Sequence, residues 1–352
     1  MKNNEKGKTK DSRIKMKPYL IKITLLTLLF LQSLFAQNVQ KNYLESADLF
    51  LTEYNKKNHL TYSLLINHKN KIVFEKYYNG FTKDKLNNLK SVTKSITSIL
   101  TGIAIDRGLI KNENKKISNL LPEFFNDKIN NNKRNITLIH ALTMSAGFEW
   151  NNFGGKLRSG WDKSSEPTKY LIRNVPMKNE PGKVWNYNSA LSHLLSDVIR
   201  KYFGNNTHNF AEKYLFNPLE IKNIKWQKRA DGNEMGNSEL FMSSRGMMKI
   251  GLLILNEGNW NGQQIVSKKW IAKSTQKYFD GFPQIGGYGY QWHLRNFGNY
   301  KSVMAVGWGG QFIIIIPELE LVIVNTSKWN VAKSTYIIFD VIEKFIIPYA
   351  EP

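Results

Sequence analysis

The segment over residues 91–108 reads SVTKSITSILTGIAIDRG and has the pattern of an amphipathic helix. Its apolar positions follow the 3.6-residue period, and they are Val92, Ile96, Ile99, Leu100 and Ile103. Gly108 is the type of residue that commonly ends a helix, because it adopts a left-handed conformation without strain. Ser91, Lys94, Ser95 and Ser98 fall on the other side of the helix. The segment therefore predicts a helix that begins with a serine and carries a lysine one turn later.

Ser-x-x-Lys at a helix start has two interpretations. In the first, Ser91 is a nucleophile and Lys94 its base, since free backbone N–H groups and the positive end of the helix dipole lie beside the serine. The dipole and partial burial would lower the pKa of Lys94. In the second, Ser91 only caps a polar helix face. The same spacing recurs at Ser12–Lys15 and Ser274–Lys277, so the motif alone leaves both interpretations open.

A second candidate segment is PGKVWNYNS over 181–189, which precedes a helix predicted over 189–203. Tyr187 is placed just before the start of this helix, where the helix dipole would favour the charged phenolate of a group whose free pKa is about 10. The alternative is that the aromatic ring only packs the loop onto the helix. A third segment, GWGGQ over 307–311, separates two predicted strands. Its glycines would let a ligand or another backbone approach closely, or would simply form a hairpin turn.

Composition excludes several classes of protein. The 352 residues contain no cysteine, which removes disulfide scaffolds, thiolate nucleophiles and iron–sulfur sites. The net charge of +22 comes mainly from 41 Lys against 9 Arg, and the lysines are scattered, so we expect a solvated basic surface and no nucleic-acid partner. No HExxH, G-x-S-x-G or Walker A motif occurs, and His140 lies in an apolar helix pattern typical of a core residue. The sequence predicts neither a metal nor a cofactor.

The first 36 residues have the pattern of an export signal. Residues 1–18 hold seven cations and two acids, and an uncharged apolar run follows over 23–31. Ala36 is a small residue before the predicted cleavage point, although Leu34 is bulky for its position. We expect a periplasmic or secreted protein with no stable membrane span after cleavage. An uncleaved anchor is the alternative, and either Met1 or Met16 could be the true start.

Strand patterns lie near both ends of the chain and helical patterns lie between them. A hairpin is predicted over 61–67 and 71–78, and later strands over 288–294, 302–308, 311–316 and 320–326. A helix is predicted over 41–58 and another over 333–347. The simplest architecture is α+β: an antiparallel sheet built from both ends (about 37–90 and 276–352), flanked by the terminal helices, with a mostly helical lobe over about 91–275. The cleft between the lobes is the expected site.

The three motifs, in this order and spacing, resemble those of the serine β-lactamase and penicillin-binding-protein superfamily. The resemblance is to the class C β-lactamase-like branch, with family VIII carboxylesterases and nylon-oligomer hydrolases, and it covers nearly all of 45–348. It implies a serine hydrolase domain over 37–352, in which Ser91 is acylated, Lys94 is the base and Tyr187 carries a second proton. It also implies an oxyanion hole formed by the backbone N–H groups of Ser91 and Gln311.

Two positions depart from the pattern of that superfamily. Ser189 stands where an asparagine usually follows the tyrosine, so the amide that orients the substrate is missing or supplied elsewhere. Trp308-Gly309-Gly310 stands where penicillin-recognising enzymes have Lys-Thr-Gly, and it resembles the Trp-Gly-Gly of some family VIII esterases. Tryptophan offers an apolar face in place of a cation, which favours an ester or an uncharged amide.

Three hypotheses follow from the sequence. The first is an exported serine hydrolase that acts on small esters or amides. The second is a peptidase for cell-wall peptides that end in D-amino acids, which Trp308 opposes. The third is a catalytically silent module that binds such ligands, which the Ser91, Lys94 and Tyr187 set opposes. The natural substrate and the oligomeric state are left open.

Overall fold

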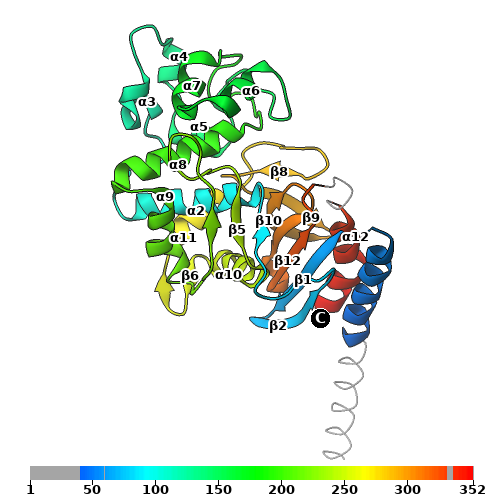
Figure 1. Cartoon of the computed structure of the whole chain (residues 1–352). Helices are drawn as coiled ribbons and strands as arrows, with labels where there is room; N and C mark the ends of the chain where they lie inside the picture. The colour runs from blue at the N-terminus through cyan, green and yellow to red at the C-terminus, as the bar shows by residue number, and fades with distance from the viewer. Residues whose placement is uncertain (1–39, 59, 331–335, 352) are drawn as a thin grey trace, which may run out of the picture.

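A computed structural model describes residues 40–58, 60–330 and 336–351. One lobe is built on a seven-stranded antiparallel sheet with the order β2-β1-β12-β11-β10-β9-β8 (Figure 1). The strands are β1 (Thr61–His68), β2 (Lys71–Tyr77), β8 (Gly287–Tyr288), β9 (His293–Phe297), β10 (Tyr300–Gly307), β11 (Gln311–Ile316) and β12 (Leu321–Ser327). Because β1 pairs with β12, the sheet joins the two ends of the chain, and the predicted fold class is confirmed.

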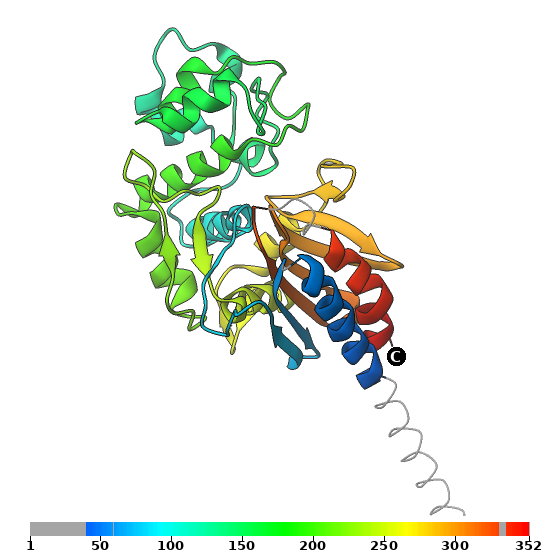
Figure 2. The same ribbon diagram turned by 45° about the vertical axis from the view of Figure 1, so that its right-hand side comes forward.

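Each face of the sheet is covered by helices. The side chains of Phe312, Ile314 and Ile316 pack with the terminal helices, whereas Ile313 and Ile315 belong to the core on the other face, as the two-residue period of a strand requires. The terminal helices are the N-terminal helix (40–58) and the run formed by α12 (Ile337–Val341), η5 (Ile342–Ile346) and α13 (Ile347–Ala350). They lie side by side in Figure 2, in blue and red. Helix α10 (Ser244–Leu255) covers the opposite face.

A helical lobe is inserted between β2 and β8. Its helices are α2 (Val92–Asp106), α3 (Ile117–Leu120), η1 (Pro122–Phe124), α4 (Asn131–Arg134), α5 (Leu138–Leu142), α6 (Lys156–Lys163), α7 (Pro167–Asn174), α8 (Ser189–Phe203), α9 (Thr207–Ala211), η2 (Glu212–Phe216) and α11 (Lys268–Ser274). Short strands accompany them: β3 (Asn87–Asn88), β4 (Lys225–Trp226), β5 (Leu240–Met242), β6 (Asn259–Trp260) and β7 (Gln263–Gln264). Helix α2 lies where the two lobes meet and contacts both α8 and β10 (Figure 1).

Two details of the predicted elements need correction. The strand predicted over 288–294 is two short strands, because Gln291 has a positive φ of 65° and breaks the extended run. Helix α2 is buried on its polar side as well as its apolar side, so it is a central helix and not a surface one. The predicted helix over 333–347 is described only from residue 336 onward.

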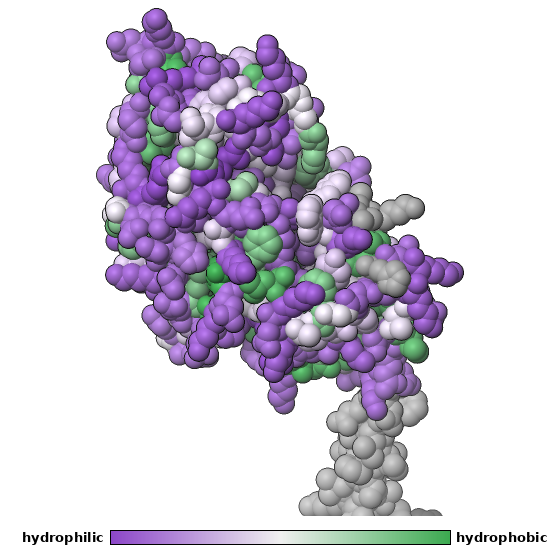
Figure 3. Space-filling view, in the orientation of Figure 1, coloured by the Kyte–Doolittle hydropathy of each residue, from purple (hydrophilic) through white to green (hydrophobic). Residues whose placement is uncertain are grey.

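The predicted export signal lies outside the described residues. Among the described helices, none combines the length and the apolar character that crossing a bilayer requires. Figure 3 shows one face of the molecule, which is mostly hydrophilic, with apolar residues gathered near the middle of the view.

Candidate active site

Ser91 stands at the position just before α2, in the loop that leads from β3 into the helix. Its side chain makes no capping hydrogen bond with the helix backbone. Its Oγ instead accepts a hydrogen bond from Lys94 Nζ at 3.1 Å. Since the hydroxyl faces the lysine, the structure brings together the pair that the motif could only indicate.

Lys94 is a lysine enclosed by protein, with 2% of its surface exposed. Its Nζ donates to the backbone carbonyl of Asn237 at 2.8 Å as well as to Ser91. Burial lowers the pKa of Lys94 well below its usual value, and the positive charge of Arg158 lowers it further. The direction agrees with the prediction, but the first cause is burial. A lysine with such a pKa is available as a neutral amine, which can accept a proton.

Tyr187 lies in the loop before α8 and is almost fully buried. Its ring centroid is 5.1 Å from Lys94 Nζ, and its hydroxyl forms a hydrogen bond with Ser91. Burial raises the pKa of Tyr187 to about 12, although the Ser91 hydrogen bond and the charge of Arg158 act in the opposite direction. The predicted tyrosinate character is therefore wrong: removal from water penalises the phenolate, so the side chain is a neutral phenol at neutral pH.

The turn over 307–311 joins β10 to β11 and touches the start of α2. A Cβ built on Gly307 would lie 2.4 Å from the carbonyl oxygen of Leu89, so only glycine lets the two backbones come this close. Gly309 and Gly310 have φ values of 76° and 88°, which the turn requires. Both predicted roles, a hairpin turn and a close backbone approach, are present. Trp308 stands half-exposed at the turn.

The side chain of Gln311 is not part of the lining of the cavity beside Ser91, whereas the predicted oxyanion role belongs to its backbone N–H. It is buried in β11 opposite Gly307, and its Nε2 donates to the carbonyl of Ser327 at 2.6 Å. The neighbouring turn residues Gly307 and Trp308 line the cavity instead. The side chain of Gln311 therefore holds the ends of two strands together.

Ser189 begins α8, and its backbone N–H donates to Asn152 Oδ1 at 2.9 Å. Both residues line the cavity. Asn152 Oδ1 also accepts from Trp150 Nε1 and from Arg158, so the NH₂ of this amide is the group left to face a ligand. Asn152 therefore brings a side-chain amide to the lining of the cavity from a different segment.

These side chains surround a cavity of about 650 Å³ between the two lobes. Ser91, Lys94 and Tyr187 lie in its wall. The remaining lining residues comprise polar and charged side chains (Lys90, Asn152, Arg158, Ser189, Asn237, Ser238, Glu239, Gln284, His293) and apolar or glycine positions (Phe153, Phe282, Ile285, Val306, Gly307, Trp308, Tyr336). Its volume falls in the usual range for a small-molecule site.

Arg158 and Asn152 are site residues that sequence reasoning missed. Arg158 extends from α6, where its Nε donates to Asp162 at 2.7 Å and its Nη1 to the carbonyl of Asn152 at 3.2 Å. No local motif marks either position, because tertiary packing alone brings α6 and the loop before it to the cavity.

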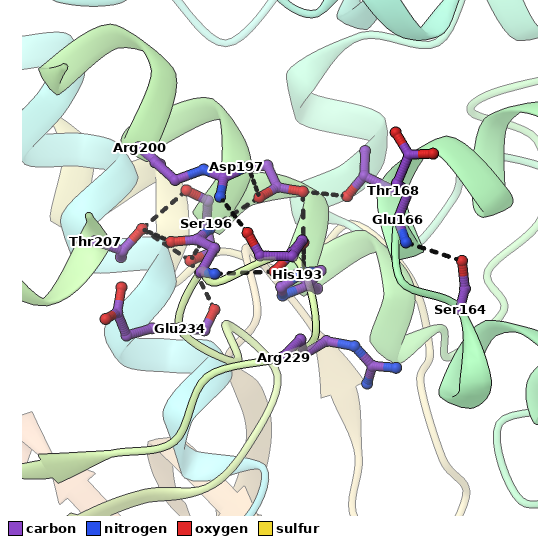
Figure 4. A network of polar contacts seen from close by, with 12 residues as sticks. Ser164, Glu166, Thr168, His193, Ser196, Asp197, Arg200, Thr207, Arg229 and Glu234 are labelled. Atoms are coloured by element: carbon purple, nitrogen blue, oxygen red, sulfur yellow. Dashed lines mark hydrogen bonds and ion pairs between the residues drawn. The ribbon is translucent and has the colours of Figure 1, made fainter. Parts of the chain in front are cut away.

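A separate buried network involves His193, Asp197 and Asp231, whose ligand atoms lie within 4.8 Å of one another (Figure 4). His193 Nε2 is 3.0 Å from Asp231 Oδ2. The oxygens of Asp197 already accept hydrogen bonds from Thr168 and Asn233. The chain's own donors therefore satisfy the carboxylates, and the network ties α7 and α8 to the segment that carries Asn237.

A buried lysine bonded to a serine at a helix start, in a cleft between an antiparallel sheet and a helical lobe, defines a serine hydrolase with the β-lactamase/transpeptidase-like fold. The Beta-lactamase family profile matches residues 36–336, and the chain belongs to this family.

The similar proteins include two that are named as hydrolases and a penicillin-binding protein homologue. The 6-aminohexanoate-dimer hydrolase of Paenarthrobacter ureafaciens is 22% identical over 293 residues, which cover 76% of this chain and 73% of that protein. The octameric penicillin-binding protein homologue from Pyrococcus abyssi has a TM-score of 0.71 at 19% identity, covering 87% of this chain and 77% of its own. EstCE1, a hydrolase with promiscuous acyltransferase activity, has a TM-score of 0.70 at 12% identity, covering 88% and 98%. The solved structures share the fold.

Proposed function

We propose that this protein hydrolyses small esters or amides through an acyl-enzyme formed on Ser91. The observation that carries the proposal is the contact between Ser91 Oγ and the buried Lys94 Nζ, at 3.1 Å, with Tyr187 beside both. A serine hydroxyl is a weak nucleophile unless a base removes its proton, and a desolvated lysine is such a base.

Acylation begins when Ser91 Oγ attacks the carbonyl carbon and its proton passes to Lys94 Nζ. The carbonyl oxygen becomes an oxyanion, which needs hydrogen-bond donors. The backbone N–H of Ser91 is one donor. The backbone N–H of Gln311, at the end of the 307–311 turn, is the second donor that the resemblance to the superfamily implies.

Collapse of the intermediate breaks the bond to the leaving group, which needs a proton. Tyr187 supplies it, since its raised pKa of about 12 keeps the phenol protonated at neutral pH. The Lys94 ammonium then returns a proton to the phenolate, so one proton has moved from Ser91 to the leaving group. In deacylation, water attacks the carbonyl carbon of the acyl-enzyme and loses a proton to the same groups, which act in reverse order. The bond from Ser91 Oγ to the acyl carbon then breaks, Ser91 regains its proton from Lys94, and the acid is released.

The wall formed by the 307–311 turn favours an uncharged part of the substrate. Trp308 is 52% exposed at the mouth of the cavity and carries an aromatic face where a lysine would hold a carboxylate. Phe282 extends the apolar surface towards Tyr187, at 5.1 Å between ring centroids. This wall supports hydrolysis of an ester or an uncharged amide over that of a penicillin.

We also propose that the protein acts outside the cytoplasm. The basic segment over 1–18 and the apolar run over 23–31 support this location. Cell fractionation and the mass of the N-terminus of the native protein test it. Mature chains that begin near residue 37 are expected, and intact chains confined to the cytoplasm would contradict the proposal.

The catalytic proposal is tested by the intact mass of the protein after treatment with a fluorophosphonate probe, followed by peptide mapping. One adduct on Ser91 is expected, with none in Ser91→Ala and an unchanged adduct in the control Ser274→Ala. An adduct elsewhere would refute the assignment of Ser91. A folded protein that forms no adduct and turns over no ester would instead support a silent ligand-binding module.

A further inference from the structure

We propose that Arg158 is a specificity residue that binds a carboxylate of the substrate, so that the preferred esters or amides carry a negative charge away from the reacting carbonyl. This inference rests on the proposed function, since it names the substrate class of the same site. The observation that supports it is that the guanidinium of Arg158 lies in the wall of the cavity and donates hydrogen bonds through Nε and Nη1, which leaves the N–H groups of Nη2 for a ligand.

The charges that line the cavity are unbalanced. Lys90, Lys94 and Arg158 face one acid, Glu239. Lys90 Nζ is 2.7 Å from Glu239 Oε1, so this cation and this acid neutralise one another. Lys94 is engaged with Ser91 and the carbonyl of Asn237. Arg158 differs from both, because its acidic partner Asp162 lies outside the lining of the cavity.

The guanidinium of Arg158 is fixed in place before any substrate binds. Its Nε donates to Asp162 Oδ2 at 2.7 Å, its Nη1 donates to Asn152, and its carbon lies 5.1 Å from the centroid of the Trp161 ring. Within the described part of the chain, no hydrogen bond uses Nη2. An arginine held in this way loses little conformational freedom when a carboxylate binds to its remaining N–H groups.

Asp162 forms an ion pair with Arg158 through Nε and leaves the Nη2 side of the guanidinium unpaired by an acid within the described residues. Its side chain is largely exposed and does not line the cavity. It is also shared, since Arg229 Nη1 lies 3.7 Å from the other carboxylate oxygen, Oδ1. Asp162 is thus shared by two arginines, of which only Arg158 lines the cavity.

The position of Arg158 also suits a substrate that reaches Ser91. Its charge acts on both Lys94 and Tyr187, whose pKa values it lowers, so it stands within electrostatic reach of the catalytic pair. Phe153 and Phe282 line the same cavity and offer apolar surface for the part of the substrate between its two functional groups. The site therefore fits a molecule with a carboxylate at one end and an ester or amide at the other.

Two matched pairs of esters test the inference and locate the carboxylate. Monophenyl adipate is compared with phenyl hexanoate, which places the charge on the acyl part. The 3-carboxyphenyl and 3-carbamoylphenyl esters of hexanoic acid place it on the leaving group. We expect kcat/KM to favour the charged member of one pair about tenfold, as one charge-assisted hydrogen bond would produce.

Variants of helix α6 test whether Arg158 causes the preference for the charged ester. Arg158→Met keeps the apolar stem and should abolish the preference, and Arg158→Lys should retain part of it. Lys163→Met removes an exposed cation from the end of the same helix α6 and should leave the ratio unchanged. Circular dichroism and Tm confirm that each variant is folded. If Arg158→Met fails to fold, the kcat/KM ratios of charged to uncharged esters are compared between Arg158→Lys and the wild type.

The outcomes separate this inference from the proposed function. Equal rates within both pairs, or a preference that survives Arg158→Met, would overturn the role of Arg158 while leaving Ser91 as the nucleophile. If no ester is turned over, the proposed function fails. Calorimetric binding to Ser91→Ala then decides the inference: tighter binding of monomethyl adipate than of methyl hexanoate, lost in Ser91→Ala/Arg158→Met, supports it, and equal binding refutes it.

Discussion

Ser91–Lys94 and Ser274–Lys277 have the same spacing and contrasting surroundings. Ser91 precedes a buried helix, and its hydroxyl bonds to a lysine that is 2% exposed. Ser274 ends helix α11, where its Oγ donates to the carbonyl of Ile271 at 3.1 Å. The side chain of Lys277 is 59% exposed and pairs with Asp280 at 2.6 Å.

The difference shows what turns a spacing into a reactive site. At the end of a helix the serine hydroxyl returns to a backbone carbonyl of its own helix, as serines commonly do. At the start of a helix no such carbonyl competes, and the lysine one turn later can reach the hydroxyl. Burial then lowers the pKa of that lysine, whereas an exposed lysine stays with its acidic neighbour.

The largest expected difference is between the two serines. Ser91→Ala should lower kcat/KM for a phenyl ester by about 10³-fold or more, because it removes the nucleophile. Ser274→Ala loses one hydrogen bond, worth about 1 kcal/mol of stability, and should keep its activity. Steady-state kinetics and Tm measure both. If both variants lost activity to a similar extent, Ser91 would not differ from Ser274 in its contribution to catalysis.

The lysines come next. Lys94→Met should lower kcat/KM by about 10²–10⁴-fold, the usual contribution of a general base. Lys277→Met changes only an exposed ion pair and should differ little from the wild type. Full activity in Lys94→Met with a normal circular dichroism spectrum would show that Ser91 is activated by another group.

A tyrosine accompanies each motif, which allows a third test. The backbone N–H of Tyr290 donates to the carbonyl of Ser274, and its hydroxyl bonds to that of Tyr278. Tyr187→Phe should reduce acylation about tenfold or more, because the leaving group loses its proton donor. Tyr290→Phe should alter Tm and leave acylation intact. Stopped-flow measurement of the acylation rate distinguishes them.

The smallest expected effect is a shift in pH dependence. The active form of Lys94 is the neutral amine, so kcat/KM should rise with pH and reach its plateau well below the 10.5 of an ordinary lysine. Arg158→Met should move this limb to higher pH, since loss of a neighbouring positive charge makes the ammonium easier to form. Lys277→Met should leave the limb in place. If kcat/KM of Arg158→Met rises over the same pH range as that of the wild type, the charge of Arg158 does not affect the pKa of Lys94.

Local patterns predicted the candidate residues that the structure brings together and the elements that hold them. The period of Val92, Ile96 and Ile103 marked α2, and the helix predicted over 189–203 has the bounds of α8. The apolar strands 311–316 and 320–326 were recognisable because turn residues separate them. Such signals act over a few residues, so the sequence carries them directly.

What the sequence did not predict depends on burial and on distant contacts. The raised pKa of Tyr187 follows from its burial, to which Phe282 and Tyr288 contribute, and these residues lie about 100 residues further along the chain. Arg158 and Asn152 reach the site only because α6 packs beside α8 through α7. The bond from the side chain of Gln311 to the carbonyl of Ser327 also depends on the pairing of β11 with a strand that lies further along the chain.

Because β1 pairs with β12, the sheet can form completely only after the end of the chain has been synthesised. The hydroxyl groups of Ser63 and Thr326 form a hydrogen bond of 2.6 Å, although the two residues are 263 positions apart in the chain. During synthesis, the helix with Ser91 emerges long before β10, β11 and β12, so it has no sheet to pack against. Closing so long a loop is slow, because its entropy cost precedes any gain from pairing. The sheet, and the cleft that it shares with the helical lobe, can therefore be completed only after the last strands have been made.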